Sequence, residues 1–311
     1  MTHSSLLKPN AFHLRKKGNI VEILKMQTEV LIAIHEFLYQ EGLLQLMPVI
    51  VSPITDPLTH PVYEASIKYL NQRLQLTKSM ALHKQIAIST LDVKGIYIIS
   101  PNVRLEKDIQ SDNHLLEFSQ LDIELRDASS LGFMSFMEDL ITYIFTRVRD
   151  RCKKELEILG THIKIPEKPF QVYSSWDLRS EFGSQFKSQI TQREADLFWI
   201  TDFEREFYDK EDDSRRGHYL NYDLFYPEGY GEALSGGERD YEYEVIIRKL
   251  EERNQSLGDF VPYLELAKAA MLGPSAGGGL GIERLVRFLT KRLHIREITL
   301  FPKIPGERIF L

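Results

Sequence analysis

The chain has 311 residues, of which 43% are hydrophobic and 27% are charged. This composition is typical of a globular protein and excludes a disordered or fibrous chain. Asp and Glu number 45 against 39 Lys and Arg, so the formal net charge is −6. That balance offers no support for nucleic-acid binding, although it leaves a local basic patch open.

Targeting and redox features point to a cytoplasmic protein with no membrane partner. The N-terminus lacks the uninterrupted apolar segment of a signal peptide. No stretch approaches the roughly 18 apolar residues that a membrane span requires. The single cysteine, Cys152, excludes an intramolecular disulfide, and its charged neighbours predict a surface thiol rather than a nucleophile.

The first predicted element is a helix that begins near residue 19 and ends before Gly42. Its apolar residues recur at helical spacing, at Ile20, Leu24, Leu31, Ile34 and Leu38. A short apolar run follows over residues 43–51, and its Pro48 predicts an edge or interface strand.

Two strands are predicted in the middle of the chain, over residues 95–99 and 118–126. In the second, the apolar residues are Leu121, Ile123 and Leu125, and the polar residues between them are Gln120, Asp122 and Glu124. Successive side chains of a strand point to opposite faces, so this strand has one polar face. Taken alone, the strand would place that face in solvent.

The second half predicts a helix over 131–159 with a core-facing stripe, then a mobile charged surface loop over 203–217. A strand over 219–225, a glycine-rich strand over 276–281 and a helix from about Glu283 follow. This order predicts an α+β fold with an antiparallel sheet flanked by helices. No linker or repeat divides the chain, so we expect one domain over residues 1–311.

Three segments carry groups suited to a polyphosphate and a zwitterionic substrate, although each alone is a weak signal. Residues 104–118 combine an arginine fork with an aromatic ring. Residues 232–239 offer oxygen ligands for magnesium and an arginine for a carboxylate. Residues 277–284 join a glycine run, against which a flat ring can lie, to an arginine in a first helical turn. No Walker A sequence occurs.

These segments resemble the signature motifs of the class II aspartyl- and asparaginyl-tRNA synthetases. The similar stretches are residues 99–106, 114–118 and 121–124 for motif 2, 279–285 for motif 3, 295–302 for the closing segment and 42–48 for motif 1. The resemblance spans roughly residues 20–305. It implies the class II catalytic fold and a homodimer with Pro48 near the two-fold axis.

Within that class, the chain resembles the archaeal asparagine synthetases related to asparaginyl-tRNA synthetase, through residues 217–224 and 229–232. Full tRNA synthetases of this kind carry an N-terminal barrel that reads the anticodon. Here the first catalytic helix starts near residue 20, so we expect a single catalytic domain without an anticodon-binding domain, and no tRNA partner.

The resemblance implies roles for individual residues. Arg104 and Arg284 are the expected catalytic residues, on the α- and γ-phosphates of ATP. The expected ATP-binding residues are these two with Glu106, His114, Phe118, Glu232 and Gly281. Glu232 and Ser235 are the expected magnesium pair. The expected substrate-binding residues are Ser79, Lys84, Gln120, Asp122, Ser235 and Arg239, with Lys84 and Arg239 on a carboxylate and Asp122 on the ammonium.

The implied reaction uses ATP, Mg and aspartate to form β-aspartyl-adenylate, which free ammonia converts to asparagine and AMP. Two departures from aspartyl-tRNA synthetases, Ala81 and Ser275, indicate a re-shaped amino-acid pocket. One alternative is an enzyme that charges a tRNA with aspartate or asparagine. Another is a non-catalytic paralogue that binds aminoacyl ligands and regulates a second protein.

Overall fold

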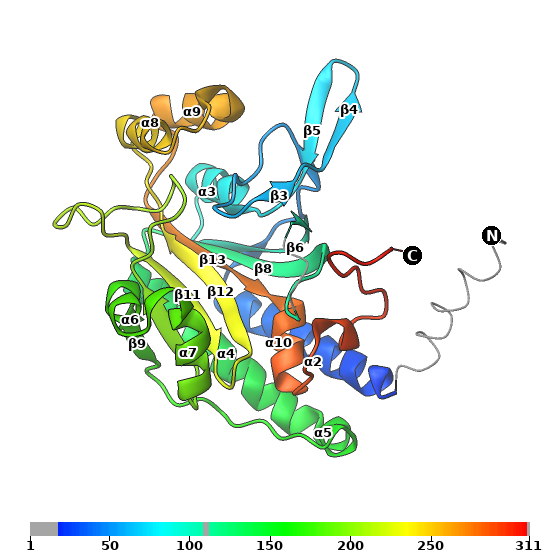
Figure 1. Cartoon of the computed structure of the whole chain (residues 1–311). Coiled ribbons are helices and arrows are strands. Elements are labelled where there is room, and N and C mark those ends of the chain that lie inside the picture. The colour runs from blue at the N-terminus through cyan, green and yellow to red at the C-terminus, as the bar shows by residue number, and fades with distance from the viewer. Residues whose placement is uncertain (1–17, 108–111, 310–311) are drawn as a thin grey trace.

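A computed structural model describes residues 18–107 and 112–309, which surround one large mixed sheet (Figure 1). In spatial order the strands are β1 (Leu44–Gln45), β6 (Gly95–Val103), β8 (Glu117–Arg126), β13 (Ser275–Gly281), β12 (Gly231–Glu238), β11 (Asn221–Tyr226), β10 (Phe198–Thr201) and β9 (Gln171–Ser174). Neighbours from β6 to β10 are antiparallel, while the edge strands β1 and β9 pair in parallel. The predicted α+β class is confirmed.

One face of the sheet is covered by helices that bury an extensive apolar core. These helices are α2 (Ile20–Gln40), α4 (Ser130–Arg151), α5 (Lys153–Leu159) and α10 (Ile282–Leu289). Their apolar residues pack with Leu121, Ile123 and Leu125 of β8, as the strand alternation predicts. The Met134 and Met137 side chains of α4 are buried core residues as well.

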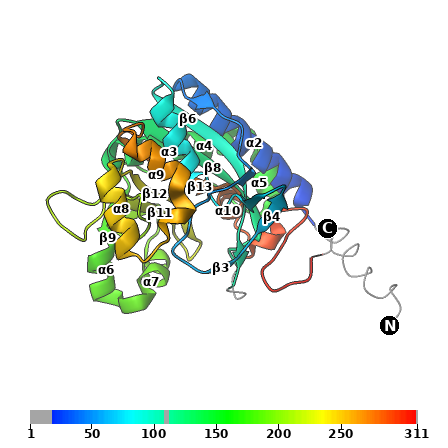
Figure 2. The same ribbon diagram turned by 90° about the horizontal axis from the view of Figure 1, so that it is seen from above.

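The other side carries α3 (Ala81–Thr90), α8 (Tyr243–Glu252) and α9 (Val261–Lys268), which share a second apolar cluster. Figure 2 shows α2 and α5 across the sheet from α8 and α9. The remaining helical elements lie beyond β9 or in connections: α6 (Ser175–Phe182), α7 (Phe186–Arg193), η2 (Gly183–Gln185), η3 (Leu257–Phe260) and η4 (Ile295–Glu297).

Several short strands carry no clear signal in the sequence. They are β2 (Val51–Ser52), β5 (Gln72–Leu76) and β4 (Ser66–Tyr69), which form a three-stranded sheet, and the pair β3 (Val62–Tyr63) and β7 (Leu105–Glu106). The two-residue strands β2, β3 and β7 are too short for a period to be visible. The predicted edge strand is β1, and Pro48 follows it.

The predictions for Cys152 and for its helix are wrong in part. The helix over 131–159 is two helices, α4 and α5, which meet at Cys152. The thiol faces the apolar core and is only 2% exposed, so it is not a surface thiol. Burial raises the pKa of Cys152 to about 11, which keeps it protonated and unreactive near neutral pH.

The predicted mobile loop over 203–217 is wrong over its first half. Phe207, Tyr208 and Asp209 are buried, and Asp209 forms a β-bridge with Arg239. Residues 213–217 are exposed, as predicted. Within the described ranges, no helix is long and apolar enough to cross a membrane. The N-terminal segment in which we expect no signal peptide lies outside the described residues.

Candidate functional site

A cavity of about 460 Å³ lies where β8, β12 and β13 meet α3 and the segment 205–209. The structure places every site residue expected from the sequence in its lining: Ser79, Lys84, Arg104, Glu106, His114, Phe118, Gln120, Asp122, Glu232, Ser235, Arg239, Gly281 and Arg284. These residues span more than 200 positions of sequence, and the fold brings them to one place. Their individual roles remain predictions.

The polar face of β8 forms part of the cavity wall and is not in solvent. Asp122 is 2% exposed and accepts hydrogen bonds from Oγ of Ser100 at 2.7 Å and from Nζ of Lys84 at 3.1 Å. Gln120 accepts a hydrogen bond from Asn102 at 2.7 Å. Because buried polar groups need partners, these contacts fix the two side chains against the sheet.

The glycines of β13 make room for these side chains. A Cβ atom at Gly277 would lie 2.5 Å from Cδ of Glu124, and one at Gly279 would lie 2.5 Å from Cδ of Gln120. The glycine run therefore leaves space for the polar side chains of β8, as well as for the ring of a nucleotide. Of the glycines of β13, Gly279 and Gly281 line the cavity.

Buried ion pairs form one end of the cavity. Nζ of Lys84 also donates to the carbonyl oxygen of Gly278 at 2.8 Å and lies 3.8 Å from Glu124. Arg239 donates to both carboxylate oxygens of Glu124, at 3.0 and 3.2 Å, and Nη1 lies 3.4 Å from Asp209. All are almost completely buried, so each charge needs its partner.

Ser275, one of the two departures from the family pattern, supports this network. Its hydroxyl donates to Oε1 of Glu124 at 2.8 Å. The second departure, Ala81, lines the cavity beside Ser79. Only Ala81 therefore faces the cavity directly.

The other end of the cavity, where the sequence resemblance predicts the nucleotide, contains Arg104 stacked on an aromatic ring. Its guanidinium carbon lies 5.0 Å from the ring centre of Phe118, and Nε donates to the carbonyl oxygen of Lys78 at 2.9 Å. Glu106 pairs with His60 at 3.1 Å, and although burial alone would raise the pKa of Glu106, His60 lowers it. An arginine held over an aromatic ring is suited to a planar base and its phosphate.

Arg284 and its neighbours close this end. Nη1 of Arg284 donates to the carbonyl oxygen of Glu232 at 3.1 Å. Burial and the nearby Arg284 lower the pKa of His114, so that imidazole is neutral near pH 7. Glu283 accepts from the backbone N–H of Ser119 at 2.9 and 3.0 Å, which fastens α10 to β8, and burial raises its pKa to about 7.

Glu232 and Ser235, the expected magnesium pair, point the same way because β12 has a bulge. The pairing register with β11 shifts there, which leaves Ala233 as the additional residue. Asp223 lies opposite Ser235, and Nζ of Lys187 is 3.2 Å from Asp223 and 3.8 Å from Glu232. Two carboxylates and a hydroxyl fit a Mg²⁺ ion that takes its other ligands from phosphates and water.

No group of three or more His, Cys, Asp or Glu side chains over residues 18–107 and 112–309 is arranged as a complete metal cage. Magnesium usually lacks such a cage, because it keeps water and phosphate ligands. The site therefore fits the ion only together with ATP.

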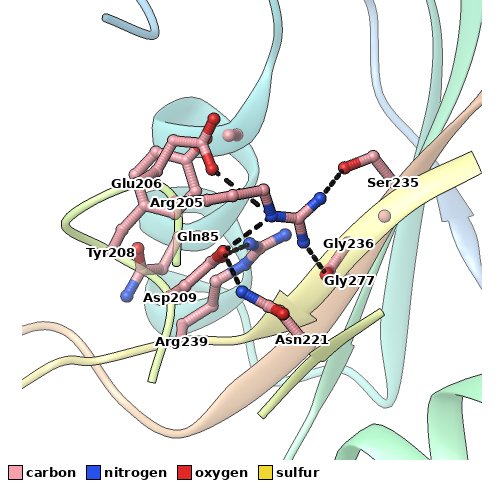
Figure 3. Close-up of polar contacts among 12 residues, drawn as sticks. Gln85, Arg205, Glu206, Tyr208, Asp209, Asn221, Ser235, Gly236, Arg239 and Gly277 are labelled. Carbon is pink, nitrogen blue, oxygen red and sulfur yellow. Dashed lines mark hydrogen bonds and ion pairs between the residues drawn. The ribbon is translucent and has the colours of Figure 1, made fainter. Parts of the chain in front are cut away.

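The sequence reasoning missed the segment 205–209, which brings charge into the cavity. Figure 3 shows Arg205 reaching from this segment toward Ser235 and Gly236, with Glu206 and Asp209 beside it. Nη1 of Arg205 lies 2.5 Å from both Oγ of Ser235 and Oδ1 of Asp223. The one available signal was the aromatic pair at 207–208 inside a charged run, which predicts burial.

Asp56 was missed as well. Its carboxylate accepts from the hydroxyls of Ser79 at 2.7 Å and Tyr208 at 2.9 Å, and it lines the cavity. Asp209 accepts from Asn221 at 2.8 Å. Both carboxylates therefore have hydrogen-bond partners within the protein.

Comparison with known proteins identifies similar sequences over nearly the whole chain. The family model of class II tRNA synthetases (D, K and N) matches residues 3–305. An asparagine–tRNA ligase of Pyrococcus abyssi is 29% identical, with 97% of this chain and 72% of that protein covered. An aspartate–tRNA(Asp/Asn) ligase of Methanopyrus kandleri is 31% identical, with 90% of this chain and 67% of that protein covered.

Solved structures agree. Asparaginyl-tRNA synthetase from Pyrococcus horikoshii, complexed with asparaginyl-adenylate, superposes with a TM-score of 0.84 and 25% identity. The superposition covers 99% of this chain and 74% of that one. The expected class II catalytic fold is confirmed. Because the named relatives are tRNA ligases, the comparisons favour the tRNA-charging alternative more directly than asparagine synthesis.

Proposed function

The chain belongs to the class II tRNA synthetases (D, K and N), and we propose that it is an ATP-dependent asparagine synthetase. ATP and aspartate would form an aspartyl-adenylate and pyrophosphate, and ammonia would then displace AMP to give asparagine. The general part of this proposal, a ligase that activates an amino acid with ATP, follows from the family.

The buried cations at one end of the cavity are the observation from which we infer aspartate as the substrate. Lys84 and Arg239 offer positive charge to a carboxylate there, while Arg104 lies at the nucleotide end. A dicarboxylic amino acid has one carboxylate for each end, and Asp122 beside Lys84 can hold its ammonium. The carboxylate at the nucleotide end is the nucleophile of the proposed reaction, and the amide of asparagine cannot replace it.

The second half of the proposal, ammonia as acceptor, is supported by charge. Glu206, Asp209 and Asp56 line the cavity. Carboxylates attract an ammonium ion and repel the phosphates of an RNA end. The resemblance of residues 217–224 and 229–232 to archaeal asparagine synthetases, inferred from the sequence, supports this assignment.

In this proposal the β-carboxylate of aspartate attacks the α-phosphorus, and the α-carboxylate contacts Lys84 and Arg239. A carboxylate nucleophile needs no general base. Arg104 and Arg284 stabilise the charge that develops on the phosphates. Glu232, Ser235 and Asp223 would hold Mg²⁺, which neutralises phosphate charge when bound. Lys187 contacts Asp223, and Arg205 contacts Asp223 and Ser235.

We also propose a homodimer, with the segment around Pro48 at its interface. Met47 is 84% exposed, and Ile50 and Val51 beside it are exposed as well. A contiguous exposed apolar segment next to an edge strand is suited to association with a second copy.

The second candidate function is charging of a tRNA with aspartate or asparagine. The tRNA ligases that this chain resembles favour it. A non-catalytic regulator is the least suited, because both arginines of the phosphate site and the Glu232–Ser235 pair are in place in the cavity.

The test is AMP formation from ATP and aspartate, with and without ammonium, in the absence of tRNA. Ammonium-dependent AMP with asparagine as product would establish the proposal. Aspartate-dependent pyrophosphate exchange without ammonium-dependent turnover would instead favour the tRNA-charging function. A failure of both reactions would refute every assignment that activates aspartate.

A further inference from the structure

Glu206 is a carboxylate in the cavity that has no role in the proposed activation of aspartate. It lies in the connection between β10 and Asp209, and its side chain is 14% exposed. Its carboxylate pairs with Nε of Arg205 at 3.8 Å, which is beyond hydrogen-bond distance. It lines the same cavity as Arg104 and Asp122.

The other acidic side chains of the cavity are held more tightly. Their partners lie at hydrogen-bond distance: Ser79 and Tyr208 for Asp56, Lys84 for Asp122, Asn221 for Asp209, Arg205 for Asp223, His60 for Glu106 and Ser119 for Glu283. Glu232 contacts Arg284 at 3.4 Å. Glu206 accepts a hydrogen bond from its own backbone N–H, but its side-chain contact with Arg205 is the longest of these, so it is the carboxylate best able to accept a new partner.

The surroundings of Glu206 favour its protonated form. Burial raises the pKa of Glu206 to about 8; Arg205 opposes this rise, and the charges of Asp209 and Asp56 add to it. Tyr208, which donates to Asp56, Arg239, which lies 3.4 Å from Asp209, and Lys78, which interacts with the charge of Asp56, are also near these carboxylates. A carboxyl group with such a pKa is a base roughly 10³-fold stronger than an ordinary glutamate.

The proposed reaction requires such a base. Near neutral pH the nitrogen donor is almost entirely ammonium, which has no lone pair and cannot attack an acyl carbon. A neutral Glu206 beside ammonia and an ionised Glu206 beside ammonium differ only in the position of one proton. In a water-poor site the neutral pair is the less costly of the two, because neither partner carries a charge.

We propose that Glu206 is the catalytic base that receives the nitrogen donor, pairing with ammonium and taking one of its protons. This inference rests on the proposed asparagine synthetase function. The ammonium N–H bond breaks and its proton goes to the Glu206 carboxylate, which leaves a lone pair on nitrogen. That lone pair forms the C–N bond, and the bond from the acyl carbon to the phosphate oxygen breaks. AMP leaves with the electron pair, and the extra proton on nitrogen passes to its phosphate.

A structural role for Glu206 is the competing explanation, since its pairing with Arg205 could fix the segment 205–209. The distance of 3.8 Å argues against it, because Arg205 is held by Ser235, Asp223 and Gly236 at 2.5 to 2.9 Å. Removal of the Glu206 charge would leave those contacts in place.

The test compares Glu206→Gln with Glu204→Gln, an exposed glutamate on the same segment. Three reactions are measured: aspartate-dependent pyrophosphate exchange, ammonium-dependent asparagine formation, and aspartyl hydroxamate formation from hydroxylamine. Hydroxylamine is a neutral nucleophile near neutral pH and needs no base. For Glu206→Gln we expect near-normal exchange and hydroxamate formation, with kcat/KM for ammonium about 10²- to 10⁴-fold lower. Glu204→Gln should leave all three unchanged.

Each other outcome identifies a different error. Equal loss of all three reactions in Glu206→Gln would assign the residue a structural or aspartate-binding role and overturn the proposal. Normal ammonium-dependent turnover in that variant would also overturn it. If the unmodified protein itself forms no asparagine from ammonium, the proposed function fails first, and the inference fails with it.

Discussion

The glycines of β13 allow a sharp test of how the cavity is built. We predict that Gly277→Ala strongly destabilises the protein, whereas Gly281→Ala does not. The new Cβ at Gly277 would overlap the carboxylate of Glu124 and the backbone carbonyl of Ile123. At Gly281 the nearest atoms belong to the Arg284 side chain, at 3.5 Å and beyond, which is ordinary contact.

The magnitude follows from what Glu124 holds. Its carboxylate is 0% exposed and accepts two hydrogen bonds from Arg239 and one from Ser275. Ile123 is paired with Gly278 of β13 and with Tyr97 of β6, so its backbone carbonyl cannot move without disrupting the sheet. The substitution therefore has to displace Glu124 from Arg239, and breaking a buried ion pair costs about 3 to 5 kcal/mol. For Gly281→Ala we expect a change within about 0.5 kcal/mol.

Chemical denaturation followed by the fluorescence of the buried Trp199 measures the free energy of unfolding of each variant. A Gly277→Ala protein as stable as the Gly281→Ala protein would refute the argument. It would mean that Glu124 has another position that keeps its hydrogen bonds, and that the glycine at 277 is not needed for them.

Three further predictions concern the site, its titration and its assembly. Arg104→Ala should lower aspartate-dependent pyrophosphate exchange about 10²- to 10³-fold without a matching loss of stability, because its expected role is to stabilise phosphate charge; an unchanged exchange rate would remove it from the phosphate site. Burial raises the pKa of Glu283 to about 7, so the stability it contributes is full below about pH 4.3 and is lost as the pH rises through 7. Relative to the unmodified protein, Glu283→Gln should therefore gain free energy of unfolding between about pH 5 and 8, and a constant difference would contradict this. Met47→Asp should convert a dimer into a monomer in light scattering after gel filtration, because Met47 is 84% exposed in the isolated chain.

Much of the cavity could be predicted from local patterns. The alternation in β8 placed Leu121 and Ile123 in the core and Asp122 on the opposite face, since a strand has only two faces. The family resemblance then predicted that the polar residues of this face bind the substrate. The glycine run was recognised, but its main role was not, because the atoms that require Gly277 belong to β8.

What could not be predicted depends on contacts between distant residues. Arg205 and Asp223 are 18 positions apart, and Asp209 and Arg239 are 30 apart. A run of charges predicts an exposed loop unless each charge finds a buried partner, and those partners lie on other strands. Cys152 was misplaced as well: it lies between α4 and α5, where it is buried among core residues from distant parts of the chain.

Charge balance in the cavity narrows the kind of substrate it can take. The buried network sets three cations, Lys84, Arg205 and Arg239, against four carboxylates, Asp122, Glu124, Asp209 and Asp223. A second carboxylate brought in alone would add to an existing excess of negative charge. A ligand that carries an ammonium beside its carboxylate leaves the balance unchanged, and Asp122 can receive that ammonium. The same excess of negative charge attracts small cations such as ammonium toward Glu206. The binding of the amino acid and the supply of its nitrogen therefore both depend on the charges of this buried network.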